Sequence, residues 1–241
     1  MTLAADLRVL FHLAIKPVRG ATHEQRLENF YAGQAGQYDQ FRQRLLQGRE
    51  EMYRSLPLTA GADWVDMGGG TGANLNCVAE KITRLRSATI VDLSPSLLRV
   101  AQDRIAARRW KNVYAVEADA RSWLPVHPVD LVTFSYSLTM MPDPLAAIDH
   151  AISILKPGGT IGVVDFYVSA KFPRENMQKH TAWTRHFWPL WFGMDNVFLT
   201  PHLLSYLQRK LRIVSLHEYT ARVPYLPLGK VPYFLLVGQK D

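Results

Sequence analysis

Short apolar runs alternate with amphipathic segments from residue 63 onward, and this pattern predicts strands separated by helices. Two of the predicted helices begin with a capping side chain followed by proline, at Ser94-Pro95 and Asp143-Pro144, which is a common helix start. Because the strands are apolar almost throughout, they indicate a parallel sheet that helices cover on both faces. The predicted strands are 63–68, 88–93, 112–118, 129–138 and 160–166, and the predicted helices are 73–85, 95–109 and 144–155.

The pattern changes after residue 166. Residues 167–200 are rich in aromatic side chains, with histidine and arginine among them. A helix is predicted over 201–210, followed by strands over 211–219 and 231–238 with only a proline-bearing loop between them. Two strands joined without a helix indicate an antiparallel pair. We therefore predict an α/β fold with a doubly wound, mostly parallel sheet of seven strands whose last strand is antiparallel.

The chain before the first strand predicts an N-terminal helical segment, residues 1–57, ahead of an α/β domain, residues 58–241. Over 3–16 one side of a helical wheel is apolar and the other is basic, a pattern typical of a helix that lies in a membrane interface. The same pattern suits a helix that packs on the domain or on a partner. A second helix starts at Thr22, glycines interrupt it, and helical periodicity resumes over 41–56. This region is predicted to be either a lid or a helical hairpin against the sheet edge.

The chain has 241 residues, is 48% hydrophobic and carries a formal net charge of +7. This charge suits an anionic membrane or a nucleic acid, and a merely solvated basic surface accounts for it equally well. A single cysteine, Cys77, excludes an internal disulfide and indicates a reducing compartment. No apolar run reaches the ~20 residues that span a bilayer, and the start of the chain lacks the features of a signal peptide. We therefore expect a cytoplasmic protein that associates peripherally with membranes.

One stretch, Asp66-Met-Gly68-Gly-Gly70-Thr-Gly72, joins the first strand to the following helix. Glycine leaves room for the backbone to approach a ligand and tolerates positive φ, and a helix start offers free N–H groups. The turn therefore predicts a nucleotide-like ligand. It also satisfies the loose dinucleotide fingerprint, so a nicotinamide enzyme stays open at this point. No Gly-Lys-Ser/Thr follows the glycines and no Cys/His cluster has zinc-ligand spacing, so we expect no P-loop and no metal.

Three aspartates lie at the ends of predicted strands: Asp66 and Asp92 close the first two, and Asp119 follows the third. Asp66 can meet a cationic or amino group, Asp92 can accept both hydroxyls of a ribose, and Asp119 beside Ala120 can pair with an adenine amino group. Together with the glycine motif and the closing strand pair, these residues resemble the class I S-adenosylmethionine-dependent methyltransferases over residues 60–240. The resemblance implies a Rossmann-like fold, S-adenosylmethionine as cofactor and S-adenosylhomocysteine as its product. The predicted cofactor contacts are Tyr38, Arg49, Asp66, Gly68, Gly70, Thr71, Gly72, Asp92, Leu93, Asp119, Ala120 and Ser135.

Segments outside these motifs resemble a narrower family, the betaine-lipid N-methyltransferases. The matching segments are 23–42, 45–50, 68–72, Phe187-Trp-Pro-Leu-Trp-Phe, Pro201-His-Leu-Leu-Ser-Tyr-Leu, Val223-Pro-Tyr-Leu-Pro and Val231-Pro-Tyr. The resemblance implies methylation of diacylglyceryl-homoserine to diacylglyceryl-trimethylhomoserine at an anionic membrane surface. Eukaryotic members fuse this domain to an aminocarboxypropyl-transferase domain that builds the headgroup. Nothing in this sequence corresponds to that domain, so a separate enzyme of that kind is implied as a partner.

The acceptor chemistry singles out aromatic residues, because the product is a quaternary ammonium that aromatic faces bind through cation–π attraction. Tyr38 is the first candidate for orienting the amine and Tyr31 the second, while Tyr136 stands at a strand tip that faces the ligand crevice. Several of the candidate aromatics are expected to be ordinary core residues. The acceptor carboxylate has several candidate cations: Arg42, Arg49, Arg185 and His186. The predicted acceptor contacts are Phe41, Arg42, Trp183, His186 and Trp188.

Two competing functions stay open. One is a small-molecule or quinone methyltransferase of the same fold, and the other is a membrane-bound scaffold that has lost catalysis. The presence of Asp66, Gly68 and Asp92 argues against the scaffold. A nucleic-acid partner is not expected, because Ser135-Tyr-Ser-Leu138 stands where amino-directed DNA methyltransferases carry Asn/Asp-Pro-Pro-Tyr/Phe.

Overall fold

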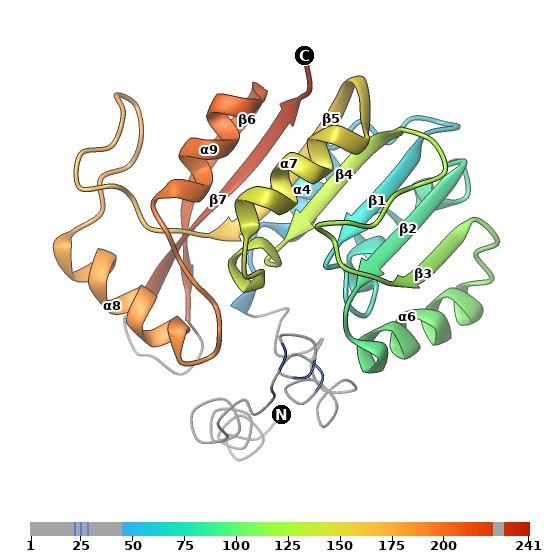
Figure 1. Cartoon of the computed structure of the whole chain (residues 1–241), viewed down its shortest axis with the longest axis horizontal. Coiled ribbons are helices and arrows are strands. Elements are labelled where there is room, and N and C mark those ends of the chain that lie inside the picture. The colour runs from blue at the N-terminus through green and yellow to red at the C-terminus, as the bar shows by residue number, and fades with distance from the viewer. Residues whose placement is uncertain (1–21, 23–24, 26–27, 29–44, 224–228) are drawn as a thin grey trace.

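The computed structural model describes residues 22, 25, 28, 45–223 and 229–241. It contains a seven-stranded sheet in the order β3-β2-β1-β4-β5-β7-β6 (Figure 1). The first five strands run parallel to one another, whereas β7 runs antiparallel to both β5 and β6. The predicted α/β sheet with an antiparallel last strand is therefore confirmed. The strands are β1 (Asp63–Met67), β2 (Ser87–Asp92), β3 (Val113–Glu117), β4 (Val129–Ser135), β5 (Leu155–Phe166), β6 (Arg212–Arg222) and β7 (Lys230–Gln239).

Successive residues of the central strands enter two separate hydrophobic cores, because side chains alternate between the faces of a sheet. Trp64 and Leu131 belong to one core, and their neighbours Val65 and Val132 belong to the other. Helices α4 and α6 and the 3-10 helix η1 contribute to the first core, and α7 and α9 contribute to the second. These helices are α4 (Arg49–Ser55), η1 (Ala73–Val78), α6 (Pro95–Arg108), α7 (Pro144–Ile154) and α9 (His202–Lys210).

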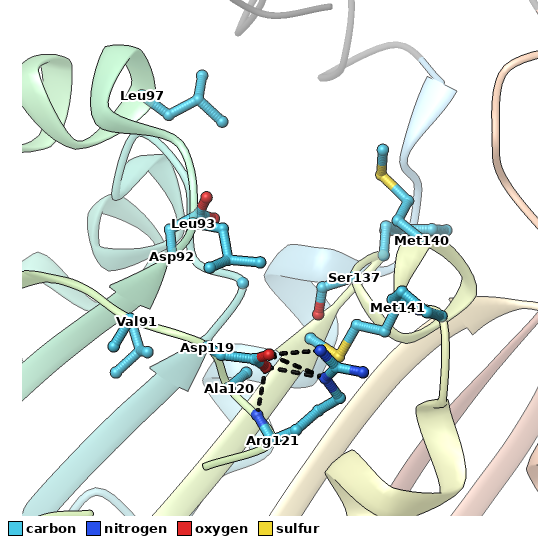
Figure 2. Close-up of a pocket in the computed structure, with 14 residues that line it drawn as sticks. Val91, Asp92, Leu93, Leu97, Asp119, Ala120, Arg121, Ser137, Met140 and Met141 are labelled. Carbon is cyan, nitrogen blue, oxygen red and sulfur yellow. Dashed lines mark hydrogen bonds and ion pairs between the residues drawn. The ribbon is translucent and has the colours of Figure 1, made fainter. Parts of the chain in front are cut away.

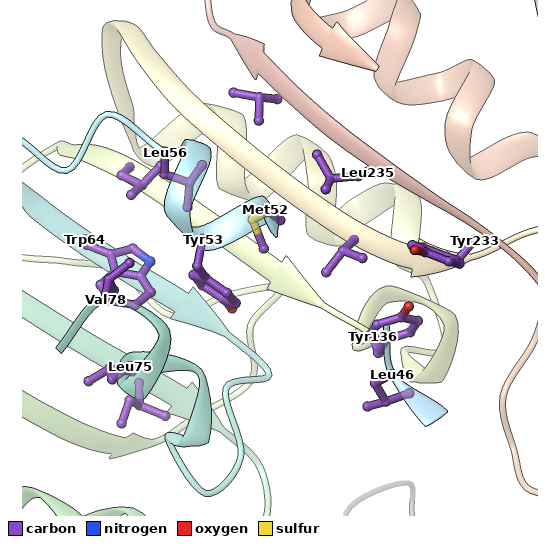
Figure 3. Packing of buried hydrophobic residues seen from close by; sticks show 14 of the residues in the cluster. Leu46, Met52, Tyr53, Leu56, Trp64, Leu75, Val78, Tyr136, Tyr233 and Leu235 are labelled. Carbon is purple, nitrogen blue, oxygen red and sulfur yellow. The ribbon is translucent and has the colours of Figure 1, made fainter. Parts of the chain in front are cut away.

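Helix α4 lies close to the sheet and completes the first core. Its Met52 and Tyr53 are fully buried, and Figure 3 shows these side chains and Leu56 lying over the strands. A Cβ at Gly162 on β5 would lie 2.7 Å from Leu56 Cδ2 and 2.9 Å from Met52 Sδ, so glycine at this position lets these two side chains pack directly on the strand. Residues on the N-terminal side of the predicted boundary at residue 57 therefore help to build the core of the α/β domain.

Local backbone conformation changes two predicted helices. The helix predicted over 73–85 is instead η1 followed by the short α5 (Ala79–Ile82), because the chain enters it through Gly72 with φ 65° and two asparagines, poor helix formers, lie in its first turns. The periodicity over 41–56 is interrupted at Gly48, which has φ 78°, so α4 starts only at Arg49.

The ends of two central strands also differ from prediction. β4 stops at Ser135 rather than at residue 138, because Tyr136 adopts φ 53° and turns the chain. β5 starts before residue 160, at Leu155, which pairs with Val129 across a register shift. The capped helix starts are confirmed: Leu97 N donates to Ser94 Oγ (3.4 Å), and the corresponding bond at α7 is present.

The aromatic region contains a helix that the sequence did not predict, α8 (Ala182–Gly193). Thr181 Oγ1 caps it by accepting from Thr184 N at 3.1 Å. Trp188 and Phe192 are buried on one side, while other large apolar residues lie on the opposite side. A helix that is apolar on both sides shows no amphipathic period, so the pattern that reveals other helices is absent here. Among the described residues, no helix is both long and apolar enough to cross a bilayer.

Candidate active site

The glycine turn lies at the carboxyl end of β1 and is bonded to the neighbouring strand. Val91 O accepts from Gly68 N at 2.7 Å and from Gly69 N at 3.3 Å. Gly68, Gly70 and Gly72 all adopt positive φ, between 56° and 67°. A Cβ on Gly68 would lie only 2.5 Å from Ser137 Cβ, so the turn can pass the tip of β4 only as bare backbone. The backbone of the turn therefore lies against the tip of β4, and this contact requires glycine at residue 68.

Asp92 joins the turn to the start of α6. Its Oδ2 accepts from Gly70 N at 2.8 Å and its Oδ1 accepts from Ser94 N at 2.9 Å. A carboxylate can accept several hydrogen bonds, and these two backbone donors orient the Asp92 side chain at the edge of the pocket. The same residue and the neighbouring Leu93 line a pocket, and the ribose contact of Asp92 stays a prediction.

The pocket lies over the carboxyl ends of β1, β2, β3 and β4. Figure 2 shows Asp92, Leu93 and Leu97 on one side and Ser137, Met140 and Met141 on the other. Two apolar walls that face each other suit a flat ring such as adenine. The complete lining is Gly68, Val91, Asp92, Leu93, Leu97, Ala118, Asp119, Ala120, Arg121, Tyr136, Ser137, Met140, Met141 and Pro142.

Asp119 lies at this pocket in an ion pair. Arg121 Nε lies 3.0 Å from both carboxylate oxygens, and Arg121 N donates to Oδ1 at 2.8 Å. The hydrogen bonds that Arg121 donates to the Asp119 carboxylate raise the pKa of Arg121, so the pair stays charged. An adenine amino group would therefore share an oxygen that Arg121 already holds, whereas Ala120 adds only apolar surface.

Asp66 is buried below the turn and is bonded to three protein donors. Its Oδ1 accepts from Tyr53 Oη (2.8 Å) and Thr133 Oγ1 (2.7 Å), and its Oδ2 accepts from Asn74 Nδ2 (3.0 Å). Burial raises the pKa of Asp66, and these bonds oppose the rise. The carboxylate thus ties α4, β4 and η1 together at the base of the turn. The cationic or amino partner expected for Asp66 is, in the structure, this set of internal donors.

Arg49 reaches the same network from α4. Its Nη1 lies 3.5 Å from Asn74 Oδ1, and its Nε donates to Leu46 O at 3.3 Å. The guanidinium is therefore near the glycine turn, where it can meet a carboxylate of either cofactor or acceptor. Thr71 is also at the turn, and its carbonyl accepts from Arg104.

At the tip of β4, Tyr136 holds neighbouring segments in place and does not serve as a base. Tyr136 Oη donates to Gln47 O at 2.6 Å, and its ring packs 4.5 Å from that of Phe166 (centroid to centroid). Burial raises the pKa of Tyr136 well above its ordinary value, so the phenol stays protonated. Ser135 is buried outside the pocket lining, and its hydroxyl has no partner within the described part of the chain.

The predicted acceptor-binding residues of α8 do not share one environment in the structure. Trp183 and His186 are exposed on α8, whereas Trp188 is buried in the core beside Phe192, with ring centroids 5.8 Å apart. Trp188 therefore serves packing rather than an open acceptor wall. Four predicted residues lie outside the described part of the chain: Tyr31, Tyr38, Phe41 and Arg42. No group of histidine, cysteine, aspartate and glutamate able to hold a metal occurs in the described ranges.

Several residues of the site were not predicted. Tyr53, Asn74 and Thr133 hold Asp66, and no local pattern marks them, because they come from three separate elements. Glu28 accepts from Ser94 Oγ at 2.8 Å and also from Ser96, at the start of α6 beside Asp92. Burial acts to raise the pKa of Glu28, but the bonds from the two serines outweigh it and the net pKa is lowered. The sequence feature that could have pointed to this contact is the pair of serines, Ser94 and Ser96, at the start of α6.

A left-handed glycine turn after β1, an acid after β2 and a pocket over the ends of parallel strands define a class I S-adenosylmethionine-dependent methyltransferase. The chain belongs to the methyltransferase-domain family, whose model matches residues 34–210. The protein is accordingly a methyltransferase with S-adenosylmethionine as cofactor. The bound cofactor supplies an electrophilic methyl group, and the residues above fit its ribose and adenine.

Curated relatives share part of this chain. A trans-aconitate 2-methyltransferase of Enterobacter sp. (strain 638) is 34% identical over 47% of this chain and 42% of its own length. The ubiquinone/menaquinone biosynthesis C-methyltransferase UbiE of Pseudomonas putida is 27% identical over 64% of this chain and 63% of its own. The chain thus spans less than two thirds of either relative.

A solved structure shares the fold. The N-methyltransferase NodS of Bradyrhizobium japonicum WM9, in complex with S-adenosyl-l-homocysteine, superposes with a TM-score of 0.57 and 15% identity. The superposition covers 85% of this chain and 98% of the NodS chain. At this identity the match supports the fold alone.

Replacing Asp92 by alanine should weaken S-adenosylhomocysteine binding by ~1–3 kcal/mol, because charged hydrogen bonds to the ribose are lost and Gly70 N loses its acceptor. Isothermal titration calorimetry measures this directly. Asp103→Ala is the control, since Asp103 is an exposed acid on α6, the helix that follows Asp92 in the chain, and it does not line the pocket. An affinity unchanged by Asp92→Ala would show that the ribose acid is misassigned.

Proposed function

We propose that this methyltransferase trimethylates the amino group of diacylglyceryl-homoserine to give the betaine lipid diacylglyceryl-trimethylhomoserine. The observation that carries the proposal is a chain of aromatic contacts between the cofactor pocket and the surface. It starts at Tyr136 in the pocket lining and runs through Phe166 and Phe192 to α8. The α8 segment Phe187-Trp-Pro-Leu-Trp-Phe is also one of those that resemble the betaine-lipid family.

The aromatic contacts suit an amine that gains methyl groups. The rings of Phe166 and Phe192 lie 5.0 Å apart, those of Trp188 and Phe187 4.9 Å, and those of Phe187 and Trp183 5.1 Å. A quaternary ammonium is attracted to such faces by ~0.5–2 kcal/mol each where they are accessible. The rings of Tyr136, Phe166 and Phe192 are buried against one another, whereas Trp183 at the outer end of these contacts is exposed. An exposed aromatic surface favours an acceptor that carries acyl chains over a small, highly charged acid.

The proposed reaction needs alignment more than a strong base. The acceptor nitrogen must be neutral to offer its lone pair, and deprotonating an amine of this kind at pH 7 costs roughly 1–5 kcal/mol. A hydrogen-bond acceptor at the nitrogen covers that cost, and in-line alignment supplies much of the acceleration. Tyr38 is proposed to orient the amine, with Tyr31 second, and Arg49 is proposed to bind a carboxylate near the turn. Tyr136 is proposed as a positioning residue, because its hydroxyl is bonded to Gln47 O.

The test is a methylation assay in mixed micelles. The protein is incubated with S-adenosylmethionine and diacylglyceryl-homoserine, and mass spectrometry follows the lipid. We expect the mono-, di- and trimethylated headgroups to appear in succession. Absence of lipid products, together with efficient methylation of another acceptor, would refute the proposal.

The relatives favour a second candidate, a methyltransferase for a small molecule or a quinone, because their names refer to trans-aconitate and to ubiquinone/menaquinone biosynthesis. Trans-aconitate and a demethylated quinone are therefore run in the same assay. Turnover of either one that exceeds turnover of the lipid would establish this candidate instead.

A further inference from the structure

Helix α8 presents a second apolar face, directed away from the core. With 3.6 residues per turn, positions 183, 187, 190 and 194 share one side of the helix, opposite positions 188 and 192. Trp188 and Phe192 are buried, whereas Trp183 is 72%, Leu190 75% and Met194 62% exposed. Three large apolar side chains on one exposed helix face are more than scattered surface residues, and such patches mark interaction sites. In Figure 1, α8 lies at the end of the molecule opposite α6.

The exposed ring of Trp183 is held in place by two half-buried rings, Phe187 and Trp191. Trp183 stacks on Phe187 with ring centroids 5.1 Å apart and planes 16° apart, and Phe187 stacks on Trp191 at 5.7 Å. These contacts fix the rings before any partner binds, so little side-chain entropy is lost on docking. Tryptophan with its indole N–H is suited to the boundary between water and lipid.

The loop that precedes α8 is basic. Residues 170–181 contain the exposed Lys171, Arg174 and Lys179, and a single acid, Glu175. Lys171 Nζ lies 5.4 Å and Lys179 Nζ 5.9 Å from the ring centroid of Phe172, which is itself 78% exposed. Cations placed beside exposed aromatic and aliphatic side chains are complementary to anionic headgroups above an acyl layer.

We propose that the outer face of α8, with the loop 170–181, is a docking surface for an anionic lipid bilayer. Trp183, Leu190 and Met194 enter the interface, and the lysines of the loop contact the headgroups. Self-association through this face is less favourable, because a two-fold contact would bring the two basic loops together. Buried ring contacts connect α8 to Tyr136 in the pocket lining, so a membrane docked on the outer face of α8 is held in a fixed position relative to the pocket.

Vesicle co-flotation of the full-length protein tests this surface. The vesicles contain phosphatidylcholine with phosphatidylglycerol and no diacylglyceryl-homoserine, so the result does not depend on the proposed acceptor. The double substitution Trp183→Gln with Leu190→Gln should lower partition about 10-fold or more, because both apolar contacts are lost. Leu124→Gln, at another residue that is 70% exposed, is the matched control and should leave partition unchanged.

A second pair of variants tests the charge. Lys171→Ala with Lys179→Ala should remove most of the preference for phosphatidylglycerol over pure phosphatidylcholine. Raising salt from about 0.1 M to about 1 M should have the same effect on the wild type, since the Debye length falls from about 10 Å to about 3 Å. The affinity for S-adenosylhomocysteine should not change in any of these variants, which shows that they are folded.

Two outcomes would overturn the proposal. In the first, the α8 double variant partitions like the wild type. In the second, sedimentation shows a dimer that this variant dissociates while vesicle partition stays unchanged, which would assign the face to self-association. A failed lipid-methylation assay with intact vesicle binding would reject only the proposed acceptor.

Discussion

Replacing Gly68 by alanine is expected to lower the affinity for S-adenosylhomocysteine roughly 30-fold or more, which corresponds to ~2 kcal/mol. The added Cβ would lie 2.5 Å from Ser137 Cβ and 3.0 Å from Ser137 Oγ. Ser137 cannot move freely, because its hydroxyl donates to Met67 O at 2.9 Å. The turn and the tip of β4 must therefore separate, and both line the pocket. Alanine at φ 67° adds backbone strain of about 1–2 kcal/mol.

The matched control for this substitution is Gly61→Ala. Gly61 has φ +77°, and an added Cβ would have no atom within 4 Å. This variant therefore carries the backbone strain without the collision and lies away from the pocket lining. Thermal unfolding should show a loss of about 1 kcal/mol for the control, whereas calorimetry should show unchanged cofactor affinity. Equal cofactor affinities of the two variants would contradict the assigned role of Gly68.

Replacing Asp66 by alanine is expected to lower the free energy of unfolding by about 3–6 kcal/mol. The change leaves three buried donors, those of Tyr53, Asn74 and Thr133, without their acceptor, and each unsatisfied group costs about 1–3 kcal/mol. The loss should appear in urea denaturation without cofactor, because it comes from contacts within the protein. A loss below about 1 kcal/mol would contradict the assigned anchoring role of Asp66.

Smaller changes keep this test informative if the alanine variant does not fold. Tyr53→Phe removes one donor and leaves the carboxylate with two, so the expected loss is about 1 kcal/mol. Tyr53 is fully buried and the missing hydroxyl adds little space, so packing changes only slightly. Combining Tyr53→Phe with Thr133→Val should cost more than either change alone, because the carboxylate loses two donors and Trp64 Nε1 loses Thr133 Oγ1 as its acceptor.

Much of the fold was predictable because it depends on local patterns. Apolar strands, the capped starts at Ser94 and Asp143 and the helix-free closing pair all appear as predicted. The bounds were wrong where a backbone conformation changed: left-handed Gly48 delays α4, and left-handed Tyr136 ends β4 early. A sequence pattern reports side-chain polarity and not backbone dihedrals, so it locates neither turn, although glycine at residue 48 permits a left-handed conformation.

The site was predictable to the extent that its residues follow strand ends. Asp92, Leu93, Asp119 and Ala120 line one pocket because the carboxyl ends of parallel strands meet at one sheet edge. The roles of Tyr31, Tyr38, Phe41 and Arg42 stay predictions, since these residues lie outside the described part of the chain.

The sequence by itself determined the class of sheet, the glycine turn and the acids beside it, because each depends on residue type and spacing along one segment. Only the tertiary structure decided that Asp66 is an internal anchor, since its partners come from α4, η1 and β4. It also decided that Trp188 is buried while Trp183 is exposed, because the two lie on opposite sides of α8 and only packing selects the inner side. Contacts between distant segments depend on how the elements assemble, and no single stretch of sequence encodes them.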